Sequence, residues 1–150
     1  MTVEITRRHA LMFGAAGVAS VSFGLSAFAK EMTTDESIAA FVGDMEIGEG
    51  SLEIDAPEIA ENGNSVPIEV SVDSAMEGDD MVEEILVLAS GNPNPGVATF
   101  KFSALSGEAR ASTRIRLAQT QDVVALARMK DGSIQRATRA IKVTIGGCGG

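Results

Sequence analysis

The sequence predicts an all-β fold, a β-sandwich of about seven short strands with a short helix before it. Apolar and polar residues alternate along most of the chain, as they do in strands with one buried face. Clusters of glycine, proline, asparagine and serine separate these runs and are typical of turns. The chain has one cysteine and no tryptophan. We therefore expect an immunoglobulin-like sandwich without the core disulfide and tryptophan of antibody domains.

Residues 1–29 have the composition of an export signal, which is removed from the mature protein. A polar start contains the pair Arg7 and Arg8, and a weakly apolar run over residues 10–28 follows. The run ends in Ala27-Phe28-Ala29, the small-x-small pattern of a cleavage site. The arginine pair resembles a twin-arginine signal, so we expect a periplasmic protein. The alternative is an uncleaved membrane anchor, because the run is nearly long enough to span a bilayer.

The composition excludes several classes of function. Acidic residues outnumber basic ones by 21 to 12, and the formal net charge of −9 argues against nucleic acid and anionic membranes as partners. The one histidine is His9, inside the export signal, so the mature chain has no imidazole for general-base catalysis. A single cysteine without histidine cannot build a zinc site, and no haem-attachment motif is present. We therefore expect no metal and no cofactor.

The carboxylates of Glu77, Asp79 and Asp80 form an acidic cluster of the kind that could hold calcium. Their spacing matches no EF-hand loop, so we interpret this segment as a solvated turn between strands.

The twin-arginine route carries proteins that are already folded, either with a cofactor or with a partner subunit. Because no cofactor is expected, we hypothesise a partner subunit that is exported together with this chain.

The predicted helix follows the export signal. Thr33 and Glu36 have the spacing of a capping box, in which each residue satisfies a backbone N–H at the helix start. Ile38, Phe41, Val42 and Met45 then recur at helical spacing and form one apolar face. We expect a helix of about three turns that ends between residues 43 and 48 and packs on the sheet or on a partner.

Seven runs with strand character follow. The run over residues 81–89 is more continuously apolar than the others, which predicts a strand buried on both faces. The runs cover residues 52–54, 66–72, 81–89, 97–102, 109–117, 122–129 and 139–145. The turn clusters lie at residues 61–65, 91–96, 106–107 and 131–132. No linker divides the chain, so we expect one folded domain over residues 30–145.

The cysteine count is unusual for an exported protein, because cysteines in an oxidising compartment normally occur in pairs. The single one stands in the terminal sequence Gly146-Gly147-Cys148-Gly149-Gly150. Glycines bury no side chain and lose the most entropy on ordering, so we expect residues 146–150 to form a flexible arm. Five residues reach roughly 17 Å at about 3.3–3.6 Å each.

The arm has the features of a delivery device. No Lys, Arg or His flanks Cys148, and the terminal carboxylate two residues on disfavours the thiolate. A cysteine enzyme would need its base and its orienting group in place. We therefore interpret the chain as a carrier whose thiol enters the active sites of other proteins.

Four features of the sequence occur together. They are the twin-arginine signal, the terminal glycine–cysteine sequence, Ala60-Glu61-Asn62-Gly63-Asn64-Ser65-Val66-Pro67 and Asn92-Pro93-Asn94-Pro95. In this combination the mature chain resembles the SoxY family of the sulfur-oxidising (Sox) system. The resemblance implies an immunoglobulin-like fold and a heterodimer with a SoxZ-like β-sandwich subunit.

The resemblance also implies a function in periplasmic thiosulfate oxidation. Sulfur intermediates would be attached covalently to Cys148, and Gly146, Gly147, Gly149 and Gly150 would be the flexible residues of the arm. Three enzymes would visit the arm in turn: a haem thiosulfate-conjugating enzyme, a sulfate-releasing hydrolase and a sulfane dehydrogenase. The chain itself would be a carrier and not an enzyme.

Two other interpretations remain open from the residues alone. The chain is then either a non-catalytic periplasmic adaptor, with Cys148 as an intersubunit disulfide, or a thiol-redox enzyme. The second fits less well, because the mature chain has neither histidine nor a second cysteine.

Overall fold

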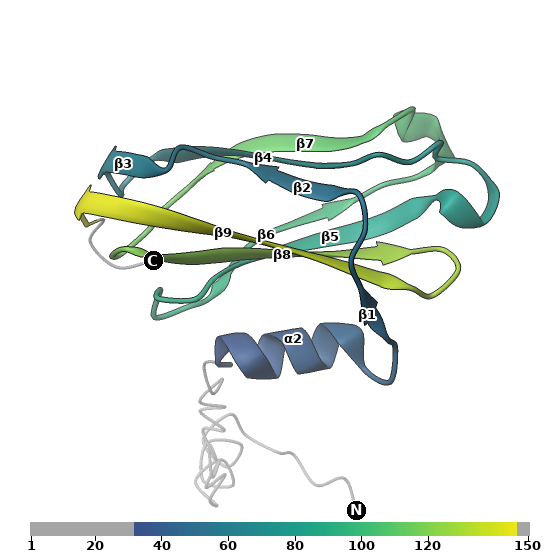
Figure 1. Cartoon of the computed structure of the whole chain (residues 1–150), viewed down its shortest axis with the longest axis horizontal. Helices are drawn as coiled ribbons and strands as arrows, with labels where there is room; N and C mark the ends of the chain where they lie inside the picture. Colours follow the sequence, from purple (N-terminus) through teal and green to yellow (C-terminus); the bar gives the residue numbers. More distant parts are fainter. Residues whose placement is uncertain (1–31, 147–150) are drawn as a thin grey trace, which may run out of the picture.

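The computed structural model describes residues 32–146, which form two facing β-sheets with one helix on the outside (Figure 1). The larger sheet has six strands and the smaller sheet has three. The larger sheet contains, in spatial order, β1 (Ile47–Gly48), β9 (Ile134–Ile145), β8 (Gln121–Met129), β5 (Val82–Ala89) and β6 (Gly96–Lys101), with β3 (Ile59–Asn62) also paired to β9. The smaller sheet contains β2 (Leu52–Asp55), β4 (Val66–Val72) and β7 (Ala109–Ile115). The prediction of an all-β sandwich is confirmed.

Strand β9 holds the larger sheet together along both of its edges. One edge pairs antiparallel with β8, and the other pairs parallel with β1 near its start and with β3 near its end. Between β1 and β3 the chain crosses to the smaller sheet as β2, which pairs antiparallel with β4. The end of β9 is therefore paired with β3, whereas its strand pairing with β8 stops at Ile141.

The core lies between the two sheets and consists of aliphatic side chains. Along β4, buried residues alternate with more exposed ones as the sequence predicts; Val70, for example, is fully buried and Pro67 is exposed. Fully buried residues of this core include Val70, Val82, Ile85, Val87, Leu117, Val123, Ala125 and Ile141. Burial of each large aliphatic side chain contributes about 1.5–3 kcal/mol, so this core is the main source of stability.

Helix α2 (Thr34–Val42) covers the outer face of the larger sheet (Figure 1). Its predicted capping box is present, with Thr33 N donating to Glu36 Oε2 at 2.8 Å and Glu36 N donating to Thr33 Oγ1 at 3.2 Å. Val42 packs with Leu88 and Ile134 in a second apolar cluster. This helix explains why β5 is apolar on both faces, because one face meets the core and the other meets the helix.

Arg128 fastens the helix to the sheet. Its guanidinium lies 4.3 Å from the centroid of the Phe41 ring, and Nη2 donates to the Phe41 carbonyl oxygen at 2.6 Å. Nη1 donates to Glu84 Oε2 on β5 at 3.4 Å. One partly buried cation thus joins the C-terminal turn of α2 to two neighbouring strands.

The structure corrects the sequence analysis at three strands, β3, β9 and β1. Residues 61 and 62, assigned to a turn, form the end of β3, whose pairing with β9 is made by the backbone and leaves little apolar pattern. Strand β9 begins at Ile134 and not at Arg139. The sequence pattern misses its first half because several of the side chains there are polar and lie outside the core. Two further residues, Ile47 and Gly48, form the short strand β1.

The acidic segment forms the predicted turn. Residues Gly78–Asp80 are one turn of 3-10 helix, η1, and Asp80 Oδ2 accepts a hydrogen bond from Ala75 N at 2.7 Å. The carboxylate therefore closes its own turn.

No helix within residues 32–146 has the length and apolarity that a membrane span requires.

We predict that Arg128→Met lowers the free energy of unfolding by about 2 kcal/mol, because it removes the hydrogen bond to Phe41 and the contact of the cation with the ring. Chemical denaturation followed by circular dichroism measures this loss. The matched control is Arg136→Met at an exposed position on β9, for which we expect a change below about 0.5 kcal/mol. Equal effects of the two substitutions would contradict the role of Arg128.

Candidate functional site

The candidate site is the end of the sandwich from which the chain continues to Cys148. Cys148 itself lies outside the described residues, as do three of the arm glycines and the residues of the export signal. The undescribed candidates are Gly147, Cys148, Gly149, Gly150, Arg7, Arg8, Ala27 and Ala29. Gly146 is described, and the geometry around it defines where the arm starts. We call the residues that hold it the arm base: Gly63, Gly91, Asn92, residues 116–121 and residues 143–146.

The last residue of β9 is held by a backbone hydrogen bond from Gly63, which is itself bonded to Leu117. Gly63 N donates to the Ile145 carbonyl oxygen at 2.8 Å, and Leu117 N donates to the Gly63 carbonyl oxygen at 2.8 Å. β9 and β3 end side by side at this end of the molecule (Figure 1). The buried Gly63 therefore links the end of β9 to the connection between β7 and β8.

The side chain of Thr120 adds a second link to β9. Its Oγ1 accepts a hydrogen bond from Val143 N at 2.9 Å and donates to the Val143 carbonyl oxygen at 3.3 Å. Thr120 lies just before β8, so it continues the pairing of β8 with β9 by means of a side chain. The hydrogen bonds of Thr120 thereby hold β9 on the β8 side as far as Val143.

A buried polar pair, Asn92 and Gln121, supports the connection that carries Thr120. Gln121 Nε2 donates to Asn92 Oδ1 at 2.9 Å, and the same oxygen accepts from Ala118 N at 2.9 Å. Asn92 Nδ2 donates to the Arg116 carbonyl oxygen at 2.8 Å. Gln121 Oε1 accepts from Gly91 N at 2.6 Å, and its Nε2 also donates to the Gln119 carbonyl oxygen at 3.1 Å. The two amides thus join the β5–β6 loop to the β7–β8 connection.

Gly146 lies against this supported connection. A β-carbon at position 146 would be 2.2 Å from the carbonyl oxygen of Ala118, a distance that no side chain tolerates. Glycine is therefore required here for close approach to the backbone, in addition to the flexibility that the sequence analysis expected. The exposed Ile145 immediately precedes it, so the chain leaves the sheet at the surface.

The arm base offers structure and no reactive group. Its polar side chains are those of Asn92, Arg116, Gln119, Thr120, Gln121 and Thr144, of which Asn92, Thr120, Gln121 and Thr144 hydrogen-bond one another or the backbone. Within residues 32–146, no three Cys, His, Asp or Glu residues are grouped so that they could hold a metal ion.

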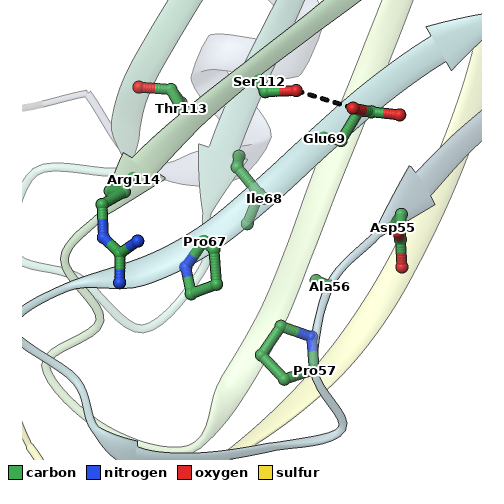
Figure 2. Close-up of a pocket in the computed structure, with 9 residues that line it drawn as sticks. All are labelled: Asp55, Ala56, Pro57, Pro67, Ile68, Glu69, Ser112, Thr113 and Arg114. Carbon is green, nitrogen blue, oxygen red and sulfur yellow. Dashed lines mark hydrogen bonds between the residues drawn. The ribbon is translucent and has the colours of Figure 1, made fainter.

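A separate hollow lies where β2 leaves β4 (Figure 2). β2 and β4 pair as far as Asp55 and Glu69, and the chain then turns away at Pro57, which leaves the start of β4 without a neighbour on that side. Glu69 Oε2 accepts a hydrogen bond from Ser112 Oγ at 2.6 Å, and Oε1 accepts from Arg110 Nη1 at 2.6 Å. Because these partners are on the neighbouring strand β7, the carboxylate is engaged within its own sheet. The lining residues are Asp55, Ala56, Pro57, Pro67, Ile68, Glu69, Ser112, Thr113 and Arg114.

Sequence reasoning found the arm but missed its support. Asn92 was assigned to an ordinary turn, and Gln121 and Thr120 were not singled out at all. The signal in the sequence is weak, because asparagine is common in turns and a lone glutamine before a strand is normally exposed. Only the fold brings residues 92 and 121 together.

The chain matches the model of a known protein family. The family described as "Sulfur oxidation protein SoxY" matches residues 38–148, which is most of the chain. No curated protein sequence matches the chain.

Among solved structures, the sulfur carrier protein SoxY from Chlorobium limicola f thiosulfatophilum is 34% identical, with a TM-score of 0.62. The match covers 74% of this chain and 96% of that one. A superoxide reductase (neelaredoxin) from Ignicoccus hospitalis has a TM-score of 0.53 at 18% identity, covering 62% of this chain and 80% of that one. A putative superoxide reductase from Thermotoga maritima has a TM-score of 0.51 at 17% identity, covering 66% and 93%. At these identities the reductases show a shared fold alone.

We predict that Ser112→Ala raises the pKa of Glu69 toward that of an ordinary glutamate. The Ser112 hydrogen bond is the largest cause that lowers this pKa, and Arg110 lowers it further against the opposing effect of desolvation. Because the pKa is lowered in the folded state, the stabilisation is present above the ordinary glutamate pKa and is lost as the pH falls through the folded value. Carboxyl-detected NMR titration measures the change. Ser71→Ala on β4 is the control. A Glu69 pKa that is unchanged by Ser112→Ala would refute the role of the Ser112 hydrogen bond.

Proposed function

Because the chain belongs to the SoxY family and is a sulfur carrier of the Sox system, we propose that its carrier group is the thiol of Cys148. The observation that carries the proposal is the extent of the family match, which runs to residue 148 and so includes the single cysteine of the chain. A covalent carrier of sulfur needs one sulfur atom that can form and break S–S bonds, and cysteine supplies it.

The first step of the proposed cycle loads the thiol with thiosulfate. An S–S bond forms between the Cys148 sulfur and the outer sulfur of thiosulfate, and the thiol proton is released. The two electrons that leave go to the haem of the conjugating enzyme, which is the oxidant. The product is a cysteine S-thiosulfonate, so the substrate stays attached to this chain.

Later steps remove oxidised sulfur and restore the thiol. A hydrolase adds water to the terminal sulfonate, releases sulfate and leaves a persulfide on Cys148. A sulfane dehydrogenase oxidises the outer sulfur of the persulfide, with water as the oxygen source, and passes the electrons to its own acceptor. A second hydrolysis then releases sulfate and regenerates the free thiol.

The protein acts in this cycle as a substrate of other enzymes and is not itself the catalyst. Its mature sequence has no histidine, and the arm base contributes amides, hydroxyls, one guanidinium and backbone groups. Glycines 147, 149 and 150 remove side-chain bulk on both sides of the sulfur, so a narrow active site can admit it. The folded domain of residues 30–145 holds the arm of residues 146–150.

The proposal includes a partner subunit and a compartment. We propose a heterodimer with a SoxZ-like subunit, exported through the twin-arginine signal of residues 1–29 and active in the periplasm. Arg7 and Arg8 would direct the export, and cleavage would follow Ala29. The acidic composition suits soluble protein partners better than nucleic acid or anionic membranes.

We predict that Cys148→Ser abolishes loading while the fold and the partner complex persist, because the substitution removes the sulfur and no core residue. Intact-mass spectrometry is done on the complex purified from cells grown with and without thiosulfate. We expect sulfur adducts on the native chain that a reductant removes, and none on the variant. A native cysteine that stays unmodified, or that is always disulfide-bonded to another subunit, would contradict the carrier.

A further inference from the structure

Resting on the proposed function, we propose that Asn92, Thr120 and Gln121 are positioning residues that fix the root of the carrier arm at Gly146. They set the place and the direction in which Cys148 is presented to an enzyme. The argument has three steps, which concern the buried amides, the link to β9 and the length of chain left beyond the root.

The amide pair is exceptional within the described part of the chain. Of residues 32–146, Asn92 and Gln121 are the only polar residues that are buried, with 7% and 8% of their surfaces exposed. Buried polar groups cost free energy unless they are hydrogen-bonded. Two apolar side chains in the same positions would pack this end of the sandwich without that cost. These two amides instead form a specific network with loop backbone. Such a network selects one loop conformation among several that are similarly compact.

The loop conformation fixed by the amides is the one that holds β9. Ala118 donates its N–H to Asn92 and presents its carbonyl oxygen to Gly146. Two residues further on, Thr120 holds both backbone groups of Val143. The connection thus contacts the strand end at two points, and each point depends on the conformation of residues 116–121.

The position of the root matters because the remaining chain is short. Cys148 is two residues beyond Gly146, so their Cα atoms lie within roughly 7 Å of each other. A root that frayed back to Val143 would lengthen this tether and would also change its direction. Productive attack requires reacting atoms to be placed closely, and a misplacement of about 1 Å can lower a rate by about a hundredfold. A fixed root therefore limits the search that the thiol makes in an active site.

Thr120→Val tests the inference, since it removes the hydroxyl that holds Val143 and leaves the arm sequence unchanged. Thr120→Ser keeps the hydroxyl and is the matched rescue. Gln121→Met tests the same hydrogen-bond network at a buried position, where 8% of the residue surface is exposed. Gly48→Ala is the control for general effects, because its β-carbon would be 3.8 Å from the nearest atom, an ordinary contact.

Three quantities are measured on the purified partner complex. The first is the thermal midpoint, and the second is the rate of Cys148 alkylation by iodoacetamide, a small reagent that needs no particular arm direction. The third is the kcat and KM of loading with thiosulfate by the haem conjugating enzyme. Thr120→Val should lower kcat about tenfold, with KM and the alkylation rate within about twofold of the native values. Thr120→Ser and Gly48→Ala should load as the native protein does.

A folded Thr120→Val that loads with native kcat would overturn the inference, and so would an equal fall of enzymatic loading and iodoacetamide alkylation. If Gln121→Met does not fold, Thr120→Val still decides the matter, because residue 120 is exposed. Failure of the proposed function gives a different result, since the native complex would then not be loaded at all.

Discussion

The pairing of β9 on both of its edges is the constraint on which the rest of this molecule depends. β8 binds one edge, β1 and β3 bind the other, and β9 is the last strand before the arm. A terminal strand with a free edge would fray from its end, because the last residues of a chain are held by few bonds. Here the final backbone carbonyl of the strand is bonded to Gly63. The sandwich therefore ends abruptly at residue 145, and a short arm has a defined origin.

This architecture separates stability from chemistry. The residues of the apolar core and of the helix clamp at Arg128 all precede the arm in the sequence, so the arm sequence is free to be almost entirely glycine. A carrier gains from this division, because the residues near its thiol must fit several active sites and cannot also serve one fixed fold. In the proposed cycle the reactive machinery belongs to the enzymes, and the chain contributes attachment and placement. The absence of imidazole from residues 30–150 agrees with that role.

The sequence predicts the elements that depend on side chains and misses those that depend on backbone. Alternation in β4 and the capping box at Thr33 are local patterns, and both are confirmed. β3 is invisible by the same reasoning, because a single buried residue, Ala60, is all that its four positions show. Cys148 and its glycines stand out by composition, whereas the pairing of residues 92 and 121 depends on a fold that brings distant loops together. Gly146 belongs to both groups, since its need for close approach to Ala118 cannot be read from a run of glycines.

A rigid root and a glycine tether are complementary, because each removes a different cost of presenting a thiol. Glycines remove steric conflict inside the enzyme but add conformational entropy that must be lost when the thiol is placed. Fixing Gly146 reduces the number of residues that carry this entropy, since only those beyond the root remain to be ordered. A longer tether would relax the geometry but would increase that loss. The short distance between Gly146 and Cys148 therefore favours a design in which direction is supplied by the folded domain and fit is supplied by the glycines.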